Sequence, residues 1–323
     1  MMKKKPLVIL SGPTAVGKTA LSIELAKAIN GAIISADSMQ VYKGMDIGSA
    51  KIMPEEMQGI PHYLIDVLEP EEEFNIVRFQ EMAKEAMKEI YAQGQIPIIA
   101  GGTGFYIQSL LYDINFSNQD TNDSYRKQLE EFAKVHGAEA LHEQLKKIDP
   151  VSYETIHANN IKRVIRALEF YHLSGEPISA HNEKERLKTS PYNFAYFVLN
   201  DDRQTIYAKI DARVDIMLKN GLLEEVKALK EKGYHKKMVA MQGLGYKEIL
   251  SYLDGECTLE EAIYTIKLET RHFAKRQLTW FRREKDCIWM DKSQYDHDEA
   301  SMLADMRKIL TDKQILTDKQ ILG

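Results

Sequence analysis

Hydrophobic and polar positions follow two different periods along the first hundred residues. Amphipathic helices are predicted over residues 18–29 and 77–91, where apolar side chains recur at three- and four-residue steps. Short apolar runs, each expected to form a buried strand, lie at residues 7–10, 32–35, 63–66 and 96–100. Strands that alternate with helices predict a parallel sheet flanked by helices, so we expect an α/β fold.

The strand pattern disappears between residues 116 and 191. Helices are predicted there over residues 125–135, 138–148 and 161–173. A strand pattern returns at 194–199, and further helices are predicted at 203–219, 221–231, 246–253 and 258–284. We therefore predict a core domain formed by residues 1–115 and 192–323, interrupted by a mostly helical insert domain at 116–191.

Composition narrows the class of protein. The chain is 44% hydrophobic and 28% charged, which is ordinary for a globular protein, and no apolar run approaches the ~20 residues that span a bilayer. The cysteines Cys257 and Cys287 form neither a disulfide framework nor a CxxC metal motif, which suits a reducing cytoplasm. The net charge of −5 requires any nucleic-acid partner to bind a local basic patch. We expect a cytoplasmic protein without a membrane partner.

A phosphate-binding loop connects the first strand to the first helix. The spacing Gly12-x4-Gly17-Lys18-Thr19 is that of a P-loop, in which backbone N–H groups and a helix N-terminus converge on phosphate oxygens. Lys18 supplies an ammonium group, and Thr19 supplies a hydroxyl suited to Mg²⁺. The loop comprises Gly12, Pro13, Thr14, Ala15, Val16, Gly17, Lys18 and Thr19. The motif leaves open whether the ligand is a nucleotide or another diphosphate.

Asp37 follows the second predicted strand. Open α/β sheets bind ligands at the carboxyl ends of their strands, so this carboxylate is expected beside the P-loop. It could help to hold Mg²⁺ or accept a proton from a nucleophile. The alternative is a structural one, in which Asp37 or Ser38 caps the next helix.

A second glycine-rich turn, GGTGFY at 101–106, follows the strand at 96–100. Its glycines allow close approach of a ligand to the backbone, but they serve a tight strand-to-helix turn equally well. Both interpretations stay open.

Two clusters of basic residues stand out in this acidic chain. Lys162, Arg163 and Arg166 lie on a predicted insert helix. A second cluster on the helix at 258–284 places most of its cations within an arc of about 140°, with aromatic residues on much of the remainder. It consists of Arg271, Lys275, Arg276, Arg282, Arg283 and Lys285. We expect one face of this helix to pack on the protein and the other to contact phosphate groups.

Seven segments, taken in order, resemble the tRNA dimethylallyltransferases, also called tRNA isopentenyltransferases. They are GPTAVGKT (12–19), DSMQVY (37–42), GMDIGSAK (44–51), GGTGFY (101–106), IKRVIRALE (161–169), MQGLGYKE (241–248) and RHFAKRQLTWFRRE (271–284). The resemblance spans almost the whole chain. It implies a P-loop NTPase-like core. It also implies an enzyme of the bacterial type, because the Cys/His zinc module of some eukaryotic members is absent.

The resemblance implies an activity. Members of this family transfer the dimethylallyl group of dimethylallyl diphosphate to N6 of adenosine 37 in tRNA and release diphosphate. By resemblance, Asp37 would be the general base, while the P-loop, Lys18 and Mg²⁺ held through Thr19 would neutralise the leaving diphosphate. Arg213 aligns with a family arginine near that leaving group.

The resemblance also implies the contacts with the tRNA anticodon stem-loop. N6 must reach Asp37, so the target base is expected to leave its stack. Residues expected near the base are Asp37, Ser38, Met39, Gln40 and Thr103. Further contacts are expected from Arg126, Lys162, Arg163, Arg166, Gln242, Gly243, Gly245, Tyr246, Lys247, Arg271, Lys275, Arg276 and Arg282. We expect the enzyme to be a monomer.

Two other hypotheses compete with this interpretation. A P-loop kinase that phosphorylates a small metabolite from ATP, with Asp37 on the acceptor hydroxyl, would account for residues 1–106. It leaves the basic helix and residues 241–248 without a role. A tRNA-binding protein with a relic P-loop would predict damage at Lys18, Thr19 or Asp37, and all three are intact.

Overall fold

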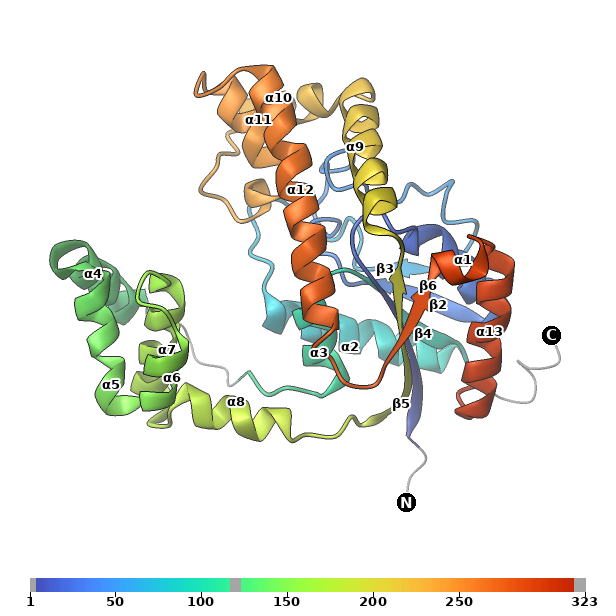
Figure 1. The fold of residues 1–323 in the computed structure, drawn as a ribbon, viewed down its shortest axis with the longest axis horizontal. Helices are drawn as coiled ribbons and strands as arrows, with labels where there is room; N and C mark the ends of the chain where they lie inside the picture. Colours follow the sequence, from blue (N-terminus) through green and yellow to red (C-terminus); the bar gives the residue numbers. More distant parts are fainter. Residues whose placement is uncertain (1–3, 117–122, 317–323) are drawn as a thin grey trace. The chain divides into compact units, whose positions relative to one another are not determined.

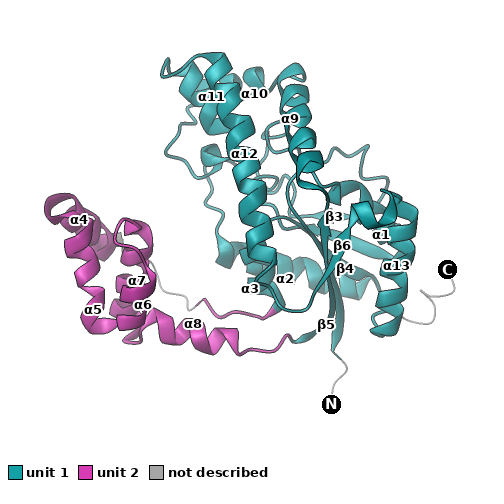
Figure 2. Cartoon of the chain, in the orientation of Figure 1, with its two compact units in different colours: residues 1–111, 191–323 teal, residues 112–190 magenta. Residues whose placement is uncertain are grey.

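The computed structural model describes residues 4–116 and 123–316 of the 323-residue chain. The chain divides into two compact units (Figure 2). Unit 1 comprises residues 1–111 and 191–323, and unit 2 comprises residues 112–190. The boundaries predicted for the insert, 116 and 191, lie close to those of unit 2.

Unit 1 is built on a six-stranded sheet in which every strand pairs parallel to its neighbours, as the alternating pattern predicts. The strands are β1 (Lys5–Ser11), β2 (Gly31–Ser35), β3 (His62–Tyr63), β4 (Ile96–Gly101), β5 (Tyr192–Asn200) and β6 (Cys287–Asp291). Their order is β3-β2-β4-β1-β5-β6. The carboxyl ends of β2, β4 and β1 are therefore neighbours, and the loops that follow them meet at one edge of the sheet.

Helices cover both faces of the sheet (Figure 1). On one face, α1 (Lys18–Ile29) and α13 (Glu299–Asp312) pack against each other and share a core with the strands. On the other, α2 (Ile76–Ala92) packs against β4 and α3 (Gly104–Leu111). The strand side chains Leu7, Val8, Ile9 and Leu10 are fully buried, which explains their continuous apolar run.

A group of helices extends from the strand ends of unit 1. It contains α9 (Arg203–Lys219), α10 (Leu222–Glu231), the 3₁₀ turn η1 (Ala240–Gln242), α11 (Tyr246–Leu253) and α12 (Leu259–Phe281). Asp202 caps α9, and Thr258 with Glu261 forms a capping box at the start of α12. The predicted bounds of α9 and α11 are confirmed, and α12 ends three residues earlier than predicted.

Unit 2 is helical and has its own core, which includes Leu141, Val164 and Leu168. Its helices are α4 (Asp123–Glu143), α5 (Leu145–Ile148), α6 (Pro150–Thr155), α7 (Ile161–Ser174) and α8 (Ile178–Arg186). The two helices predicted over 125–135 and 138–148 correspond to α4, α5 and a break at Gly137, whose φ of 88° and ψ of 164° are not helical.

Several elements differ from the prediction. The strand expected at 63–66 covers only His62 and Tyr63, because Leu64 and Asp66 take positive φ values of 63° and 54° that end the extended backbone. The sequence pattern did not reveal α3, α6, α8, β6, η2 (Lys292–Tyr295) or α13. In the part of the chain that the structure describes, there is no helix with the length and apolar character of a membrane span.

Candidate active site

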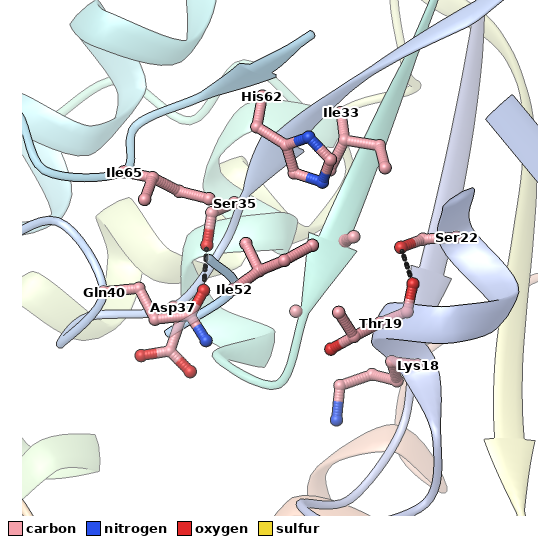
Figure 3. A pocket seen from close by; sticks show the side chains of 12 residues that line it. Lys18, Thr19, Ser22, Ile33, Ser35, Asp37, Gln40, Ile52, His62 and Ile65 are labelled. Carbon is pink, nitrogen blue, oxygen red and sulfur yellow. Dashed lines mark hydrogen bonds between the residues drawn. The ribbon is translucent and has the colours of Figure 1, made fainter. Parts of the chain in front are cut away.

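The candidate site is a pocket at the carboxyl ends of β1, β2 and β4. Lys18 and Thr19 line one side of it, and Asp37 and Gln40 lie opposite them (Figure 3). The walls of the pocket also include Ile33, Ile52, Ile65 and His62. The structure therefore brings together the P-loop and the carboxylate that the sequence placed at two separate strand ends.

The P-loop has the local geometry that its glycines predict. Gly17 precedes α1 with a φ of 98°, in the left-handed region that glycine adopts without strain. The ammonium of Lys18 donates hydrogen bonds to the carbonyl oxygens of Gly12 (2.9 Å) and Pro13 (2.7 Å). The lysine thus lies over its own loop, beside the amino end of α1, where an anion is stabilised by the helix dipole.

Two charged side chains that line the pocket, Lys18 and Asp37, interact electrostatically with each other and with Arg213. Burial and the neighbouring guanidinium of Arg213 lower the pKa of Lys18 to about 7. Burial raises the pKa of Asp37 despite hydrogen bonds and two nearby cations. Burial also lowers the pKa of Arg213, and the carboxylate of Asp37 opposes that shift. Arg213 lies on α9, far along the chain from the other two residues.

The backbone after β2 turns sharply at Asp37. One carboxylate oxygen of Asp37 accepts a hydrogen bond from the N–H of Met39 at 2.8 Å, and the N–H of Gln40 also interacts with the carboxylate. No helix begins there in the described residues, so the capping role considered from the sequence is wrong. Asp37 stabilises a local turn and still lines the pocket.

The oxygen atoms in the pocket fit Mg²⁺. The described residues contain no cluster of three His, Cys, Asp or Glu side chains that would hold a metal by themselves. Magnesium sites beside phosphates need only one or two protein oxygens, the remaining ligands being phosphate oxygens and water. The hydroxyl of Thr19, an exposed residue in the first turn of α1, and the carboxylate of Asp37 are such oxygens.

The turn GGTG after β4 packs against α12. A Cβ atom at Gly104 would lie 2.2 Å from the Trp280 ring, so glycine is needed there for packing. The N–H of Thr103 donates to the carbonyl oxygen of Ala36 at 3.2 Å, which places Thr103 next to the Asp37 turn. Of the two roles considered for these glycines, ligand approach and a tight structural turn, the structural one is observed for Gly104.

Gln277 is a residue of the site region that sequence reasoning missed. It is buried on α12, where its side-chain oxygen accepts from the P-loop N–H of Thr14 at 2.9 Å and its amide donates to the carbonyl of Gly102 at 3.0 Å. It therefore joins the P-loop to the GGTG turn. The signal available in the sequence was a polar glutamine among the aromatic residues on the face of this helix that was expected to pack on the protein.

Lys292 was also missed. It lies in η2 after β6, is only 5% exposed, and pairs with Glu299 at 2.8 Å. A Cβ atom at Gly17 would lie 2.8 Å from its ammonium group, so Lys292 is adjacent to the P-loop. The ion pair of Lys292 with Glu299 therefore lies beside the P-loop.

The basic face predicted on α12 is exposed. Lys275 and Arg276 on α12 are exposed, as is Arg282, which was predicted on this helix but follows its last residue. A groove at this face includes Lys275, Arg276 and Trp280 of α12 and Arg283 beyond its end. Arg271 differs from these exposed cations, because its guanidinium makes a bidentate ion pair with Asp211 on α9. The buried residues of α12 are Ala262, Ile266, Ala274, Gln277 and Phe281, while Phe273 is half-buried.

The segment from Gln242 to Lys247 lies beside the Asp37 turn. Gly243 contacts the side chain of Met39. Tyr246 is fully buried and its hydroxyl donates to Glu225 at 2.7 Å. The side chain of Gln242 donates to the carbonyl of Lys236, and Gly245 precedes α11 with a φ of 93°. The structure gives Tyr246 an internal contact, whereas the resemblance placed it on tRNA.

In unit 2, the basic residues of α7 differ in exposure. Lys162 and Arg163 are exposed, and Arg166 is half-buried. Arg126 on α4 makes a bidentate ion pair with the buried Glu169 on α7, at 2.9 and 2.7 Å. This pair joins two helices of the unit, a structural task that the sequence did not reveal.

Comparison with known proteins places the chain in a family. The IPP transferase family (IPPT) matches residues 40–284. A tRNA dimethylallyltransferase of Lachnoclostridium phytofermentans is 63% identical over 310 residues, which cover 96% of this chain and 99% of that protein. The kinase alternative finds no support in these matches.

Solved structures agree with that assignment. The tRNA isopentenylpyrophosphate transferase of Bacillus halodurans is 43% identical with a TM-score of 0.73, covering 96% of this chain and 98% of its own. That of Staphylococcus epidermidis is 42% identical with a TM-score of 0.70, covering 95% and 100%. A eukaryotic dimethylallyltransferase acting on tRNA is 32% identical with a TM-score of 0.78, covering 93% and 77%. The chain belongs to the IPP transferase family.

Proposed function

We propose that this protein transfers the dimethylallyl group of dimethylallyl diphosphate to N6 of adenosine 37 in tRNA, with release of diphosphate. The observation that carries the proposal is the pocket in which Asp37 faces Lys18 and Thr19 of the P-loop, with Arg213 interacting with both Lys18 and Asp37. Relatives that are named for this reaction match nearly the full chain. The P-loop then holds a leaving diphosphate instead of presenting ATP for phosphoryl transfer.

Asp37 is the general base in this mechanism. The adenine amine is a weak nucleophile because its lone pair is delocalised into the ring, and it becomes a better one as its proton is removed. N6 forms a bond to C1 of the dimethylallyl group, the C1–O bond breaks with its electron pair going to diphosphate, and the N6 proton passes to Asp37. Burial raises the pKa of Asp37, which brings its basicity closer to the working pH.

The leaving diphosphate gains charge as the C1–O bond breaks. Lys18, Arg213 and the N–H groups at the start of α1 are arranged to stabilise that charge where it develops. Thr19 would hold Mg²⁺ through its hydroxyl. A bound Mg²⁺ would supply further positive charge against the diphosphate oxygens.

The anticodon stem-loop is the proposed nucleic-acid partner, bound by one copy of the chain. The exposed cations of α12 and of α7 provide phosphate contacts in a protein whose net charge is negative. The target adenine would leave its stack to reach Asp37, with Ser38, Met39, Gln40 and Thr103 around it.

A direct assay tests the function. The protein is incubated with radiolabelled dimethylallyl diphosphate, Mg²⁺ and unmodified tRNA, and label in tRNA is measured. Transfer that depends on tRNA, on Mg²⁺ and on an adenine at position 37 is the expected result. A parallel reaction with γ-labelled ATP and candidate small acceptors is expected to show no phosphoryl transfer. Label transfer from ATP without prenylation would contradict the proposal.

The pH dependence of the reaction follows from two shifted pKa values. Lys18, whose pKa is lowered to about 7, loses its charge as the pH rises through that value, so kcat/KM for dimethylallyl diphosphate is expected to fall on the alkaline side. Asp37 has a raised pKa and must be ionised to act as base, so the same parameter is expected to fall on the acidic side. Initial rates from about pH 5 to about pH 9 check this. A flat alkaline limb would contradict the role of Lys18.

Lys275→Ala tests the basic face of α12. The variant is expected to bind all substrate tRNAs more weakly, and the slope of log affinity against log salt concentration is expected to fall by about 1, because one phosphate contact is lost. The matched control is Lys88→Ala, which removes an exposed lysine on α2 that pairs with Glu85. Equal salt slopes for the two variants and the wild type would contradict a contact between Lys275 and a tRNA phosphate.

A further inference from the structure

The segment GMDIGSAK at residues 44–51 has no task in the reaction proposed above. It forms a loop after Tyr42 that is closed by the buried ammonium of Lys51. Lys51 donates to the carbonyl oxygen of Tyr42 at 2.6 Å and pairs with Asp46 at 2.6 Å and with Asp66. These contacts give the loop a defined shape without regular secondary structure.

Glu225 on α10 binds the backbone of this loop. One of its carboxylate oxygens accepts from the N–H groups of Asp46 (2.9 Å) and Ile47 (2.8 Å). The other accepts from the N–H of Gly48 (3.1 Å) and the hydroxyl of Tyr246 (2.7 Å). A single carboxylate therefore binds three consecutive amides, and such charge-assisted bonds are roughly twice as strong as neutral ones.

Tyr246 holds the same loop from α11. Its buried ring lies against Gly48, where a Cβ atom would come within 2.6 Å of the ring, so only glycine allows this contact. Glu225 and Tyr246 thus contact the loop from two helices that lie about two hundred residues further along the chain. The loop depends on tertiary contacts for its position.

The loop in turn contacts the pocket through Gln40. The side-chain amide of Gln40 donates to the carbonyl oxygens of Ala50 (3.1 Å) and Ser49 (3.4 Å), and its oxygen accepts from Ser35 at 3.4 Å. Gln40 lines the pocket together with Asp37 (Figure 3). The orientation of its amide is therefore set by the carbonyls of the loop whose N–H groups bind Glu225.

We infer that Glu225 and Tyr246 are positioning residues for the target adenine, acting through loop 44–51 on the amide of Gln40. The inference rests on the proposed function. Neither side chain lines the pocket. Glu225 binds the N–H groups of the loop and the hydroxyl of Tyr246, while the carbonyl oxygens of the same loop bind the amide of Gln40. Misplacement of a recognition group by a fraction of an ångström weakens binding of the base without altering the P-loop.

The test compares Glu225→Gln with Glu224→Gln, a neutralisation of the adjacent, exposed residue on the same helix. Glu225→Gln is expected to raise KM for tRNA about 10-fold. KM for dimethylallyl diphosphate is expected to stay within about twofold of the wild-type value, because the P-loop is not involved. Glu224→Gln is expected to match the wild type. Tyr246→Phe, which keeps the ring and removes the hydroxyl, is expected to raise KM for tRNA by a smaller factor, and it replaces Glu225→Gln if that variant fails to fold.

A double-mutant cycle with Gln40→Ala decides whether the effect passes through Gln40. The variant that combines Gln40→Ala with Glu225→Gln is expected to be no worse than Gln40→Ala alone. Additive losses would overturn the inference, as would equal behaviour of Glu225→Gln and Glu224→Gln or parallel increases in both KM values. Failure of the wild-type chain to prenylate tRNA would instead overturn the proposed function.

Discussion

The Asp37→Asn variant is expected to transfer the dimethylallyl group about 10²–10⁴-fold more slowly than the wild type. The reason is that asparagine cannot accept the N6 proton, whereas its side-chain oxygen still accepts the hydrogen bond from the N–H of Met39. The variant therefore keeps the turn after β2 and loses the group that accepts the proton. The measurement is the single-turnover rate of label transfer to tRNA at saturating substrates.

Binding measurements separate chemistry from folding in this variant. The affinity of Asp37→Asn for tRNA and its melting temperature are expected to stay close to those of the wild type. Asp37→Ala, which loses the hydrogen bond to Met39 as well, is expected to be at least as slow and somewhat less stable. Turnover of Asp37→Asn at a near-normal rate would contradict the assignment of Asp37 as general base.

The Lys18→Met variant is expected to lose about 10²–10³-fold in kcat/KM for dimethylallyl diphosphate. Methionine has nearly the same length as the aliphatic part of lysine but no charge, so the pocket loses the ammonium that is proposed to stabilise the leaving diphosphate. Removal of one preorganised donor from a site of developing charge has effects of this size. The measurement is the initial rate as a function of the dimethylallyl diphosphate concentration, with tRNA saturating.

The matched control for Lys18→Met is Lys27→Met. Lys27 lies near the end of the same helix, is exposed, and pairs with Glu24. It is expected to have wild-type kinetics. The alkaline fall in kcat/KM is also expected to disappear in Lys18→Met, because the titrating ammonium has been removed. Persistence of that fall in Lys18→Met would assign it to another group.

The parts of the site that sequence reasoning could predict are those formed by local segments. The P-loop depends on eight consecutive residues, and its glycines, lysine and threonine encode its conformation directly. Asp37 could be placed beside it because parallel strands bring their carboxyl ends to one edge of a sheet. The structure adds that β4 lies between β1 and β2, which sets the GGTG turn between the two loops.

Other parts of the site depend on contacts between residues far apart in the sequence. Gln277 reaches the P-loop from α12, and Lys292 reaches it from the segment after β6. Arg213 could be named from the family resemblance alone, and its interaction with Lys18 and Asp37 is visible only in the structure. The sequence does not indicate which distant backbone groups a glutamine such as Gln277 will bind.

The sequence by itself determined the α/β class, the P-loop motif, the bounds of α1, α2, α7, α9, α10 and α11 to within one residue, and the resemblance to the family, because periodicity and motif spacing are local properties. The tertiary structure decided the order of the strands and the pairing of β6 with β5. It also decided the partners of Tyr246 and Arg271, which are Glu225 and Asp211. Tyr246 and Arg271 were expected on tRNA, and both make internal contacts. The physical reason is that a side chain's exposure and partner depend on which elements pack against it, and one-dimensional patterns do not specify that packing.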